Sequence, residues 1–286
     1  MGRTENKIVF EDTSRLCKEN NTLADAITHS NQNQKLIKET DDLPSAAGKK
    51  TYPQPATVIV SKKRSYAAAS AYPDKKVCVL NFASAANPGG GVVNGASAQE
   101  ECLCRCSTLY WNLDIPEMWN TFYQPHRKSR DPLHNDDCIY TPDVIVCKTD
   151  TDQPDLMNEK DWYKVNVISC AAPNLREKPS NAMNPMAGAK KVSITPKKLL
   201  ELHEKRMRRI LDLAAENKNE VVILGAFGCG AFQNDPGVVA LAMKHVLPDY
   251  LHVFETIEFA VYCSPRDDSN YRAFQRTLQP LTKTTK

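Results

Sequence analysis

Two glycine-rich segments and one pair of adjacent carboxylates are the residues best suited to chemistry in this 286-residue chain. Eight of its 11 glycines lie in segments 89–95 and 225–237, although average usage would give about twenty glycines over the whole chain. A run of glycines lets the backbone approach a ligand closely and present several N–H groups to it. We therefore expect both segments to bind a ligand that carries phosphates.

The first glycine segment follows the apolar run VCVLNF (77–82) and precedes the start of a helix. Ser97 and Glu100 fit the S-x-x-E capping box, which predicts the helix to begin there. Glu100 and Glu101 then lie in its first turn, where negatively charged carboxylates interact favourably with the positive end of the helix dipole. Two interpretations stay open: the acids only stabilise the helix, or one of them faces the ligand as a general acid and base.

The second glycine segment, in VVILGAFGCGAFQNDP, again lies between a strand and a helix start. Gly228 and Gly230 match part of a dinucleotide fingerprint, but Gln233 stands where its third glycine belongs. Neither glycine segment is followed by the GK[ST] of a P-loop. Because loops at the carboxyl ends of buried strands meet at one edge of a sheet, we expect the two to converge on a diphosphate and its sugars.

Short apolar runs without alternation predict strands that are buried on both faces. They are TVIV (57–60), VCVLNF (77–82), VNVIS (165–169), VVILG (221–225) and IEFAVYC (257–263). Helices are predicted to begin at Thr195-Pro196 and at Asn234-Asp235-Pro236. Strands that alternate with helices indicate an α/β sandwich.

Apolar positions at helical spacing predict which side chains these two helices bury. The first set is Leu199, Leu200, His203, Met207, Ile210, Leu211 and Ala214, and the second is Val239, Leu241, Ala242 and Val246. We expect His203 to be a packed core residue rather than a ligand. Segment 110–160 reads as irregular, apart from a hairpin-forming stretch, IYTPDVIV.

The N-terminal segment differs in character from the rest of the chain. Residues 1–50 predict a polar, helical N-terminal extension, accessory to a catalytic domain at 51–286, and residues 39–56 read as a linker. Composition, with 41% hydrophobic and 25% charged residues, indicates a globular protein. No apolar run is long enough to span a membrane.

Charge and cysteine content narrow the class of protein further. A net charge of +3 gives no strong case for nucleic-acid binding, and the short basic runs read as solvated surface. Ten irregularly spaced cysteines and no secretory segment predict reduced thiols in a cytosolic or nuclear protein. Cys102, Cys104 and Cys106 alternate, so a helix would point them to different faces, and we expect no metal site.

The segment NFASAANPGGGVVNGASAQEE resembles the signature of the poly(ADP-ribose) glycohydrolases, a branch of the macrodomain superfamily. In that signature GGG is followed at a short spacing by QEE, here Gly89–Gly91 and Gln99-Glu100-Glu101. IYTPDVIV, VNVISCAAPN and LGAFGCGAFQNDP follow in the order of the bacterial, or microbial, type. The resemblance covers roughly residues 57–275 and implies a three-layer α/β/α macrodomain with a mixed central sheet.

The resemblance also implies roles for the residues of both segments. Glu101 would be the catalytic residue, and Glu100 would bind a ribose hydroxyl of the distal ADP-ribose unit. Gln99 would hold the first helical turn and the catalytic geometry. The residues that would wrap the distal ribose and diphosphate are Asn87, Gly89, Gly90 and Gly91.

In the second segment the resemblance implies a cradle for the phosphates. Phe232 would pack against the distal ribose and help set its angle. The residues that would donate backbone N–H groups to the phosphates are Gly228, Cys229, Gly230 and Ala231.

The activity that the resemblance implies is hydrolysis of the ribose–ribose O-glycosidic bonds of poly(ADP-ribose), releasing ADP-ribose from chain ends. A protonated Glu101 would deliver a proton to the leaving oxygen and then accept one from water, which needs no metal and no cofactor. We expect a monomer whose partners are poly(ADP-ribose) or ADP-ribosylated proteins, without direct nucleic-acid or membrane binding. Two alternatives stay open: a non-catalytic ADP-ribose reader, and a mono-ADP-ribosyl hydrolase acting on modified protein or nucleic acid.

Overall fold

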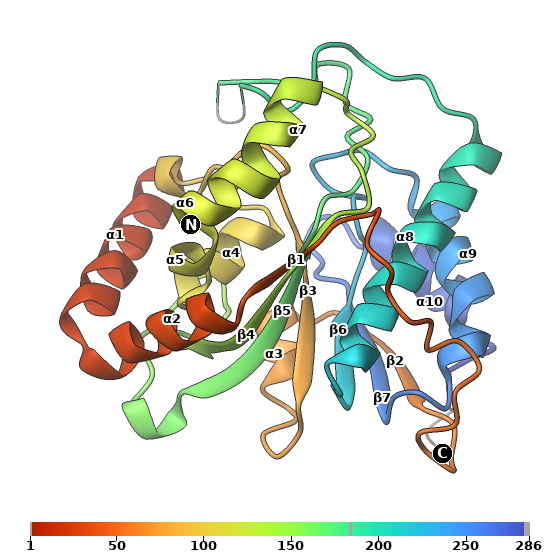
Figure 1. The fold of residues 1–286 in the computed structure, drawn as a ribbon, viewed down its shortest axis with the longest axis horizontal. Helices are drawn as coiled ribbons and strands as arrows, with labels where there is room; N and C mark the ends of the chain where they lie inside the picture. The colour runs from red at the N-terminus through yellow and green to blue at the C-terminus, as the bar shows by residue number, and fades with distance from the viewer. Residues whose placement is uncertain (1, 183–184, 283–286) are drawn as a thin grey trace. The chain divides into compact units, whose positions relative to one another are not determined.

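The computed structural model describes residues 2–182 and 185–282, and its strands form one mixed sheet (Figure 1). The hydrogen-bonded strand order is β1-β4-β5-β3-β6-β7-β2. The chain divides into two compact units: unit 1 holds Met1–Glu39 and Asn81–Val192, and unit 2 holds Thr40–Leu80 and Ser193–Lys286. The α/β class and the mixed sheet expected from the sequence are confirmed.

In unit 1 the strands run antiparallel. β4 (Cys138–Val146) pairs with β5 (Tyr163–Cys170) on one side and with the short β1 (Lys35–Ile37) on the other. The register of β4 shifts between Thr141 and Val144, where Pro142 lacks an N–H and Asp143 adopts φ +55°. IYTPDVIV is therefore one bulged strand that forms its hairpin with β5, and not a hairpin by itself.

The N-terminal segment of unit 1 forms two helices, α1 (Arg3–Glu19) and α2 (Asn21–Asn33). They break at Asn20, whose side-chain oxygen accepts a hydrogen bond from the N–H of Leu23 and caps α2. Leu23 is fully buried and packs with Ile145 of β4, which stabilises the fold by about 2 kcal/mol. Figure 1 shows α1 and α2 lying beside the short helices of this unit.

The expectation of irregular structure across 110–160 is wrong for its first part. Residues 109–129 are largely helical, in the order α5 (Leu109–Leu113), α6 (Pro116–Met118), the π-helix η2 (Trp119–Tyr123) and α7 (Gln124–Ser129). The turns are short and rich in aromatic side chains, so no window shows a clear helical period. Unit 1 also contains η1 (Val92–Asn94), α4 (Gln99–Cys106) and η3 (Glu159–Asp161).

Parallel strands dominate unit 2, as the continuous apolar runs predict. β2 (Thr57–Ser61) pairs with β7 (Thr256–Ala260), β7 with β6 (Val221–Leu224), and β6 with the start of β3 (Val77–Phe82). The crossovers β6-to-β7 and β2-to-β3 run across the sheet in opposite directions. Right-handed connections therefore place their helices on opposite faces.

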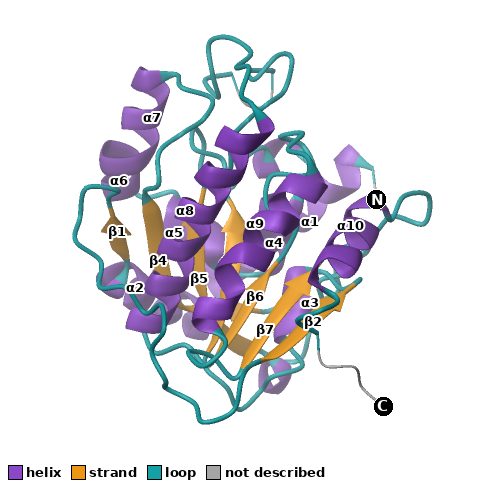
Figure 2. Ribbon diagram, turned by 90° about the vertical axis from the view of Figure 1, so that its right-hand side faces the viewer, coloured by secondary structure: helices purple, strands orange, loops and turns teal. Residues whose placement is uncertain are grey.

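Those two crossover helices are α9 (Pro236–Val246) and α3 (Ser65–Ala69). On the face of α9, the long α8 (Pro196–Glu216) and α10 (Ser269–Leu278) pack against it (Figure 2), and η4 (Leu247–Tyr250) follows it in the chain. Both predicted helix starts are confirmed, because the side chains of Thr195 and Asp235 accept hydrogen bonds from N–H groups of the first turn.

The predicted buried face of α8 is correct except for Leu200, which is half-buried. In α9 the expectation that Leu241 lies inside is wrong, since 36% of it is exposed. An apolar side chain at that position costs little at a surface, so hydrophobicity alone does not determine its side of the helix.

His203 of α8 is a core residue, as expected, and only 1% of it is exposed. Its Nε2 lies 2.9 Å from Oδ1 of Asn234, to which it donates, and its ring packs edge-on against Phe227. Burial lowers the pKa of His203 to about 4, so the folded protein holds the neutral imidazole.

Acid should therefore destabilise the protein through His203. A histidine whose pKa falls on folding contributes fully above its ordinary pKa of 6.5, and the contribution is lost as the pH falls toward 4. We expect the wild type to lose about 1.4 kcal/mol of unfolding free energy per pH unit in that window, relative to His203→Gln. Urea unfolding at pH 7, 6 and 5 measures this, and equal pH dependence of the two proteins would contradict it.

Candidate active site

The helix behind the first glycine segment begins one residue later than the Ser97 capping box predicts. α4 starts at Gln99 with Ala98 as its N-cap, and no side chain caps it. The reason is that the carboxylate of Glu100 bonds elsewhere: Oε2 accepts from the N–H of Ser84 at 2.7 Å and Oε1 from Nδ2 of Asn81 at 3.3 Å. The predicted Ser97–Glu100 capping box is therefore wrong.

Gln99 ties the start of α4 to the end of β3. Its Oε1 accepts a hydrogen bond from the N–H of Phe82 at 2.9 Å. Nearby, the N–H of Ala83 donates to the carbonyl of Cys170 at the end of β5. The first turn of α4 is thereby fixed to the carboxyl ends of two neighbouring strands in unit 1.

Glu101 lies beneath the glycine turn, with 7% of its surface exposed. Its Oε1 accepts a hydrogen bond from the N–H of Gly91 at 2.9 Å, whereas its buried Oε2 has no partner among the described residues. Burial raises the pKa of Glu101, and the bond from Gly91 opposes part of that rise.

Glu100 is buried as deeply, with 3% exposed. Burial raises the pKa of Glu100 well above its ordinary value, and the neighbouring charge of Glu101 raises it further. The two carboxyls therefore resist simultaneous ionisation. At least one of them holds a proton at a pH where an exposed glutamate is ionised.

The glycines of the first segment are required by close contacts. Gly89 and Gly90 adopt φ of +61° and +58°, a region that side chains rarely enter. A Cβ on Gly90 would lie 2.5 Å from Oε1 of Glu101, and one on Gly89 would lie 2.8 Å from the ring of Tyr110. The bare backbone of the turn thus leaves room for the buried carboxylates.

α1 packs against η1 of this loop and against α4. Nδ2 of Asn6 donates to the carbonyl of Gly95 at 3.1 Å, and Oγ1 of Thr13 donates to the carbonyl of Arg105 at 2.7 Å. Both bonds are buried, one at the end of the glycine segment and one in the last turn of α4. α1 is therefore bonded both to the end of the glycine loop and to α4, the helix that carries Glu101.

The second glycine segment forms a compact loop in unit 2. The N–H of Cys229 donates within the turn to the carbonyl of Ala226 at 3.0 Å. The N–H groups of Gly228, Gly230 and Ala231 donate to no group of the described residues. Gly228 has φ +79°, and Phe232 is half-buried.

Asn234 holds that loop in shape. Its Nδ2 donates to the carbonyls of Gly228 at 3.0 Å and Phe232 at 3.4 Å, while its Oδ1 accepts from His203. The convergence of this loop with the first one stays a prediction.

Sequence reasoning missed several residues that support the site. Asn81 and Ser84 bind Glu100, and both lie within the segment that carries the resemblance, so its polar residues were the available signal. Arg127 bonds to the loop at Ala86 from 41 residues along the chain, and no local pattern marks it. Asn234 was assigned only to a helix start.

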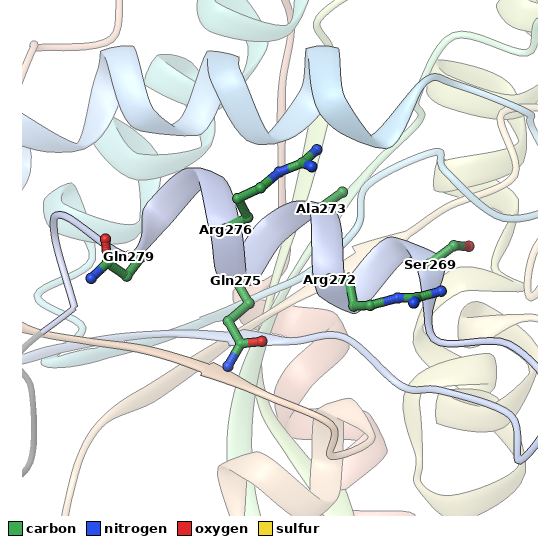
Figure 3. Close-up of a pocket in the computed structure, with 6 residues that line it drawn as sticks. All are labelled: Ser269, Arg272, Ala273, Gln275, Arg276 and Gln279. Atoms are coloured by element: carbon green, nitrogen blue, oxygen red, sulfur yellow. The ribbon is translucent and has the colours of Figure 1, made fainter.

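A hollow on the surface of α10 contains none of the predicted site residues (Figure 3). It is lined by Ser269, Arg272, Ala273, Gln275, Arg276 and Gln279. Within residues 2–182 and 185–282, no three His, Cys, Asp or Glu side chains are grouped to hold a metal ion. No helix in the same ranges is both long and apolar enough to cross a membrane.

Gly95 provides a test of the packing of α1. It shares φ +75° with Gly48, but a Cβ on Gly95 would lie 2.1 Å from the carbonyl oxygen of Arg3, whereas one on Gly48 meets open space. We expect Gly48→Ala to cost about 1 kcal/mol of unfolding free energy from backbone strain alone. Gly95→Ala should cost about 2 kcal/mol more, because α1 must shift. Urea unfolding measures both, and equal losses would show that α1 does not press on the loop.

Comparison with known proteins gives one family. The protein-family model described as "Microbial-type PARG, catalytic domain" matches residues 5–149 of the sequence, which contain Gly89–Gly91 and both glutamates. No protein among those with curated descriptions matches the chain.

Solved structures extend the match over nearly the whole chain. Poly(ADP-ribose) glycohydrolase from Thermomonospora curvata is 28% identical with a TM-score of 0.81, covering 96% of this chain and 100% of that chain. The same enzyme bound to the inhibitor ADP-HPD is 27% identical with a TM-score of 0.78, covering 96% and 99%.

A third structure is more similar in sequence. Poly(ADP-ribose) glycohydrolase from Deinococcus radiodurans in complex with ADP-ribose is 31% identical with a TM-score of 0.75, covering 90% of this chain and 98% of that chain. The fold class, the enzyme class and the poly(ADP-ribose) glycohydrolase function expected from the sequence are confirmed: the chain belongs to the family of microbial-type PARG catalytic domains.

Proposed function

We propose that this chain releases ADP-ribose from the ends of poly(ADP-ribose), with Glu101 as the general acid and base and Glu100 as its buried neighbour. The proposal rests on one observation, the difference between the two carboxyl groups. Both oxygens of Glu100 accept hydrogen bonds, from Asn81 and Ser84, whereas Glu101 has one oxygen bound by Gly91 and one without a partner.

That difference assigns a location for the proton. Oε1 of Glu101 accepts from Gly91, so the carboxylic acid carries its proton on Oε2. Burial raises the pKa of both carboxyls, and that of Glu100 more strongly, but the two donors that bind Glu100 favour its ionised form, so we place the proton on Glu101. The negative diphosphate of a bound substrate would favour this protonated form further.

Cleavage then needs two proton transfers at Glu101. Oε2–H protonates the oxygen of the leaving ribose as the glycosidic bond breaks, and an oxocarbenium-like centre develops on the other sugar. The resulting carboxylate accepts a proton from the attacking water, which returns Glu101 to its starting form. Glu100 would bind a ribose hydroxyl, because a carboxylate oxygen accepts more than one hydrogen bond.

The substrate phosphates would lie on the second glycine loop. The N–H groups of Gly228, Gly230 and Ala231 have no partner among the described residues and can donate to phosphate oxygens. The N–H of Cys229 already donates to Ala226, so in this proposal Cys229 shapes the turn. Phe232 would pack against the distal ribose, while Asn87 with Gly89–Gly91 would wrap it and the diphosphate.

Residues 1–50 would serve as an accessory to the catalytic domain at 51–286, as the bonds from Asn6 and Thr13 support. We also propose a cytoplasmic or nuclear location, supported by ten cysteines that form no disulfide, a pattern typical of a reducing compartment. A monomer that binds ADP-ribosylated proteins and no nucleic acid stays a prediction, which light scattering and a nucleic-acid binding assay would test.

Glu101→Gln tests the assignment of the acid. An amide fills the same space but donates no proton, so we expect kcat on automodified polymer to fall about 10²- to 10⁴-fold. The affinity for ADP-ribose should stay within about twofold, because Oε1 keeps its bond from Gly91. Release of ADP-ribose measures kcat, and calorimetry measures the affinity.

Glu100→Gln is the matched variant. It should lower kcat less than Glu101→Gln does, and it should destabilise the fold by about 1–3 kcal/mol, because an N–H₂ replaces one acceptor.

Full activity in Glu101→Gln would refute the mechanism. Tight ADP-ribose binding without turnover in the wild type would indicate a reader, and release from singly modified substrates alone would indicate a mono-ADP-ribosyl hydrolase.

Asn234→Asp tests the phosphate loop. An aspartate cannot donate to the carbonyls of Gly228 and Phe232, so the loop should loosen and the Kd for ADP-ribose should rise about tenfold. Asn217→Asp is the control, because its Nδ2 bonds the carbonyl of Leu213 at the end of α8, outside the loop. Equal affinities for the two variants would argue against a phosphate cradle at this loop.

A further inference from the structure

Arg127 of α7 lies against the glycine segment although it is remote from it in sequence. Its Nε donates to the carbonyl of Ala86 at 2.6 Å, and its Nη2 donates to Oδ1 of Asn87. A guanidinium only donates hydrogen bonds, so the oxygen of the Asn87 amide must face it. Arg127 thereby sets the orientation of that amide, with its oxygen toward the guanidinium and its N–H₂ group on the other side.

The other side of the guanidinium is also held. Cζ of Arg127 lies 4.6 Å from the ring centroid of Trp119, which gives a cation–π contact. Nε1 of Trp119 donates in turn to Oδ1 of Asp114 at 2.7 Å. The guanidinium is therefore fixed between an anchored indole and the loop, with few rotamers left to it.

The π-helix η2 explains how Trp119 and Arg127 meet. They lie eight residues apart, a spacing that leaves two side chains about 80° apart around a regular α-helix. A π turn closes i→i+5 hydrogen bonds and so adds about one residue to the turn. The bond from the N–H of Gln124 to the carbonyl of Trp119 is of this kind, and the extra residue brings Trp119 and Arg127 to one face.

Asn87 in turn is connected to the catalytic carboxyls through its backbone. Its carbonyl accepts from the N–H of Gly90 at 3.0 Å, and its own N–H donates to Oγ of Ser84 at 3.2 Å. The N–H of Ser84 donates to Glu100. The backbone thus fixes where Asn87 stands relative to the glutamates, and Arg127 fixes how its amide is turned.

We propose that Arg127 is a positioning residue for substrate: it acts through the amide of Asn87, which it holds in the orientation that binds the hydroxyls of the distal ribose. This inference rests on the proposed function, which gives Asn87 to the substrate. It makes the π-helix of unit 1 part of the recognition of an ADP-ribose unit. A direct contact of the guanidinium with the diphosphate is the competing account.

A double-mutant cycle separates the two accounts. Calorimetry with ADP-ribose would compare the wild type, Arg127→Met, Asn87→Ala and the double variant. Each single variant should weaken ADP-ribose binding about tenfold, and the double variant should bind no more weakly than Asn87→Ala alone. On the polymer KM should rise, while kcat should change less than about threefold.

Two further variants serve as controls. Lys128→Ala removes the same charge from the next, exposed residue of α7 and should leave the affinity within about twofold. Arg127→Lys keeps the charge but not the planar fork, so it should resemble Arg127→Met. If Arg127→Met unfolds the protein, Arg127→Lys replaces it in the double-mutant cycle.

The outcomes are distinct. Additive losses in the double variant, or full affinity in Arg127→Lys, would overturn the inference, because Arg127 would then act as a charge on its own. Unchanged affinity in Asn87→Ala would overturn it as well, since nothing would be transmitted through that amide. A wild type that binds no ADP-ribose would refute the proposed function itself, and this inference with it.

Discussion

Unit 1 depends on one constraint: two buried carboxyl groups, those of Glu100 and Glu101, must fit beneath a glycine turn that has no side chains. Taking a carboxylate out of water costs several kcal/mol unless hydrogen bonds replace its hydration. Here Gly91 provides one such bond to Glu101, while Ser84 and Asn81 provide two to Glu100. Movement of the loop would therefore break hydrogen bonds that buried carboxyl groups need.

This constraint explains why supports from several elements converge on a short loop. Gly90 must lack a side chain because Oε1 of Glu101 occupies the space that a Cβ would need. α1 holds the end of the loop at Gly95 and the last turn of α4 at Arg105. Arg127 holds the beginning of the loop at Ala86. Gly90 and α1 limit the position of Glu101, whereas Arg127 fixes the part of the loop that carries Asn87.

Much of this could be predicted from local sequence. The apolar runs predicted the strands to within a few residues, because strands buried on both faces need continuous hydrophobicity. The cap residues Thr195 and Asp235 predicted the starts of two helices, because capping is a contact within one turn. The capping box at Ser97 failed for the complementary reason: Glu100 had better partners in Asn81 and Ser84, which lie sixteen or more residues away.

The sequence by itself determined the chemistry that is available: two adjacent acids behind a triple glycine, and a second glycine loop before a helix. Those features depend on residue type and spacing along the chain, which the sequence states directly. Only the tertiary structure decided how the acids differ, with Glu100 bonded at both oxygens and Glu101 left with one oxygen unpartnered. It also decided that Arg127 and α1 support the loop. The physical reason is that burial and hydrogen-bond partners come from residues distant in sequence, and a linear pattern does not record which of them will meet.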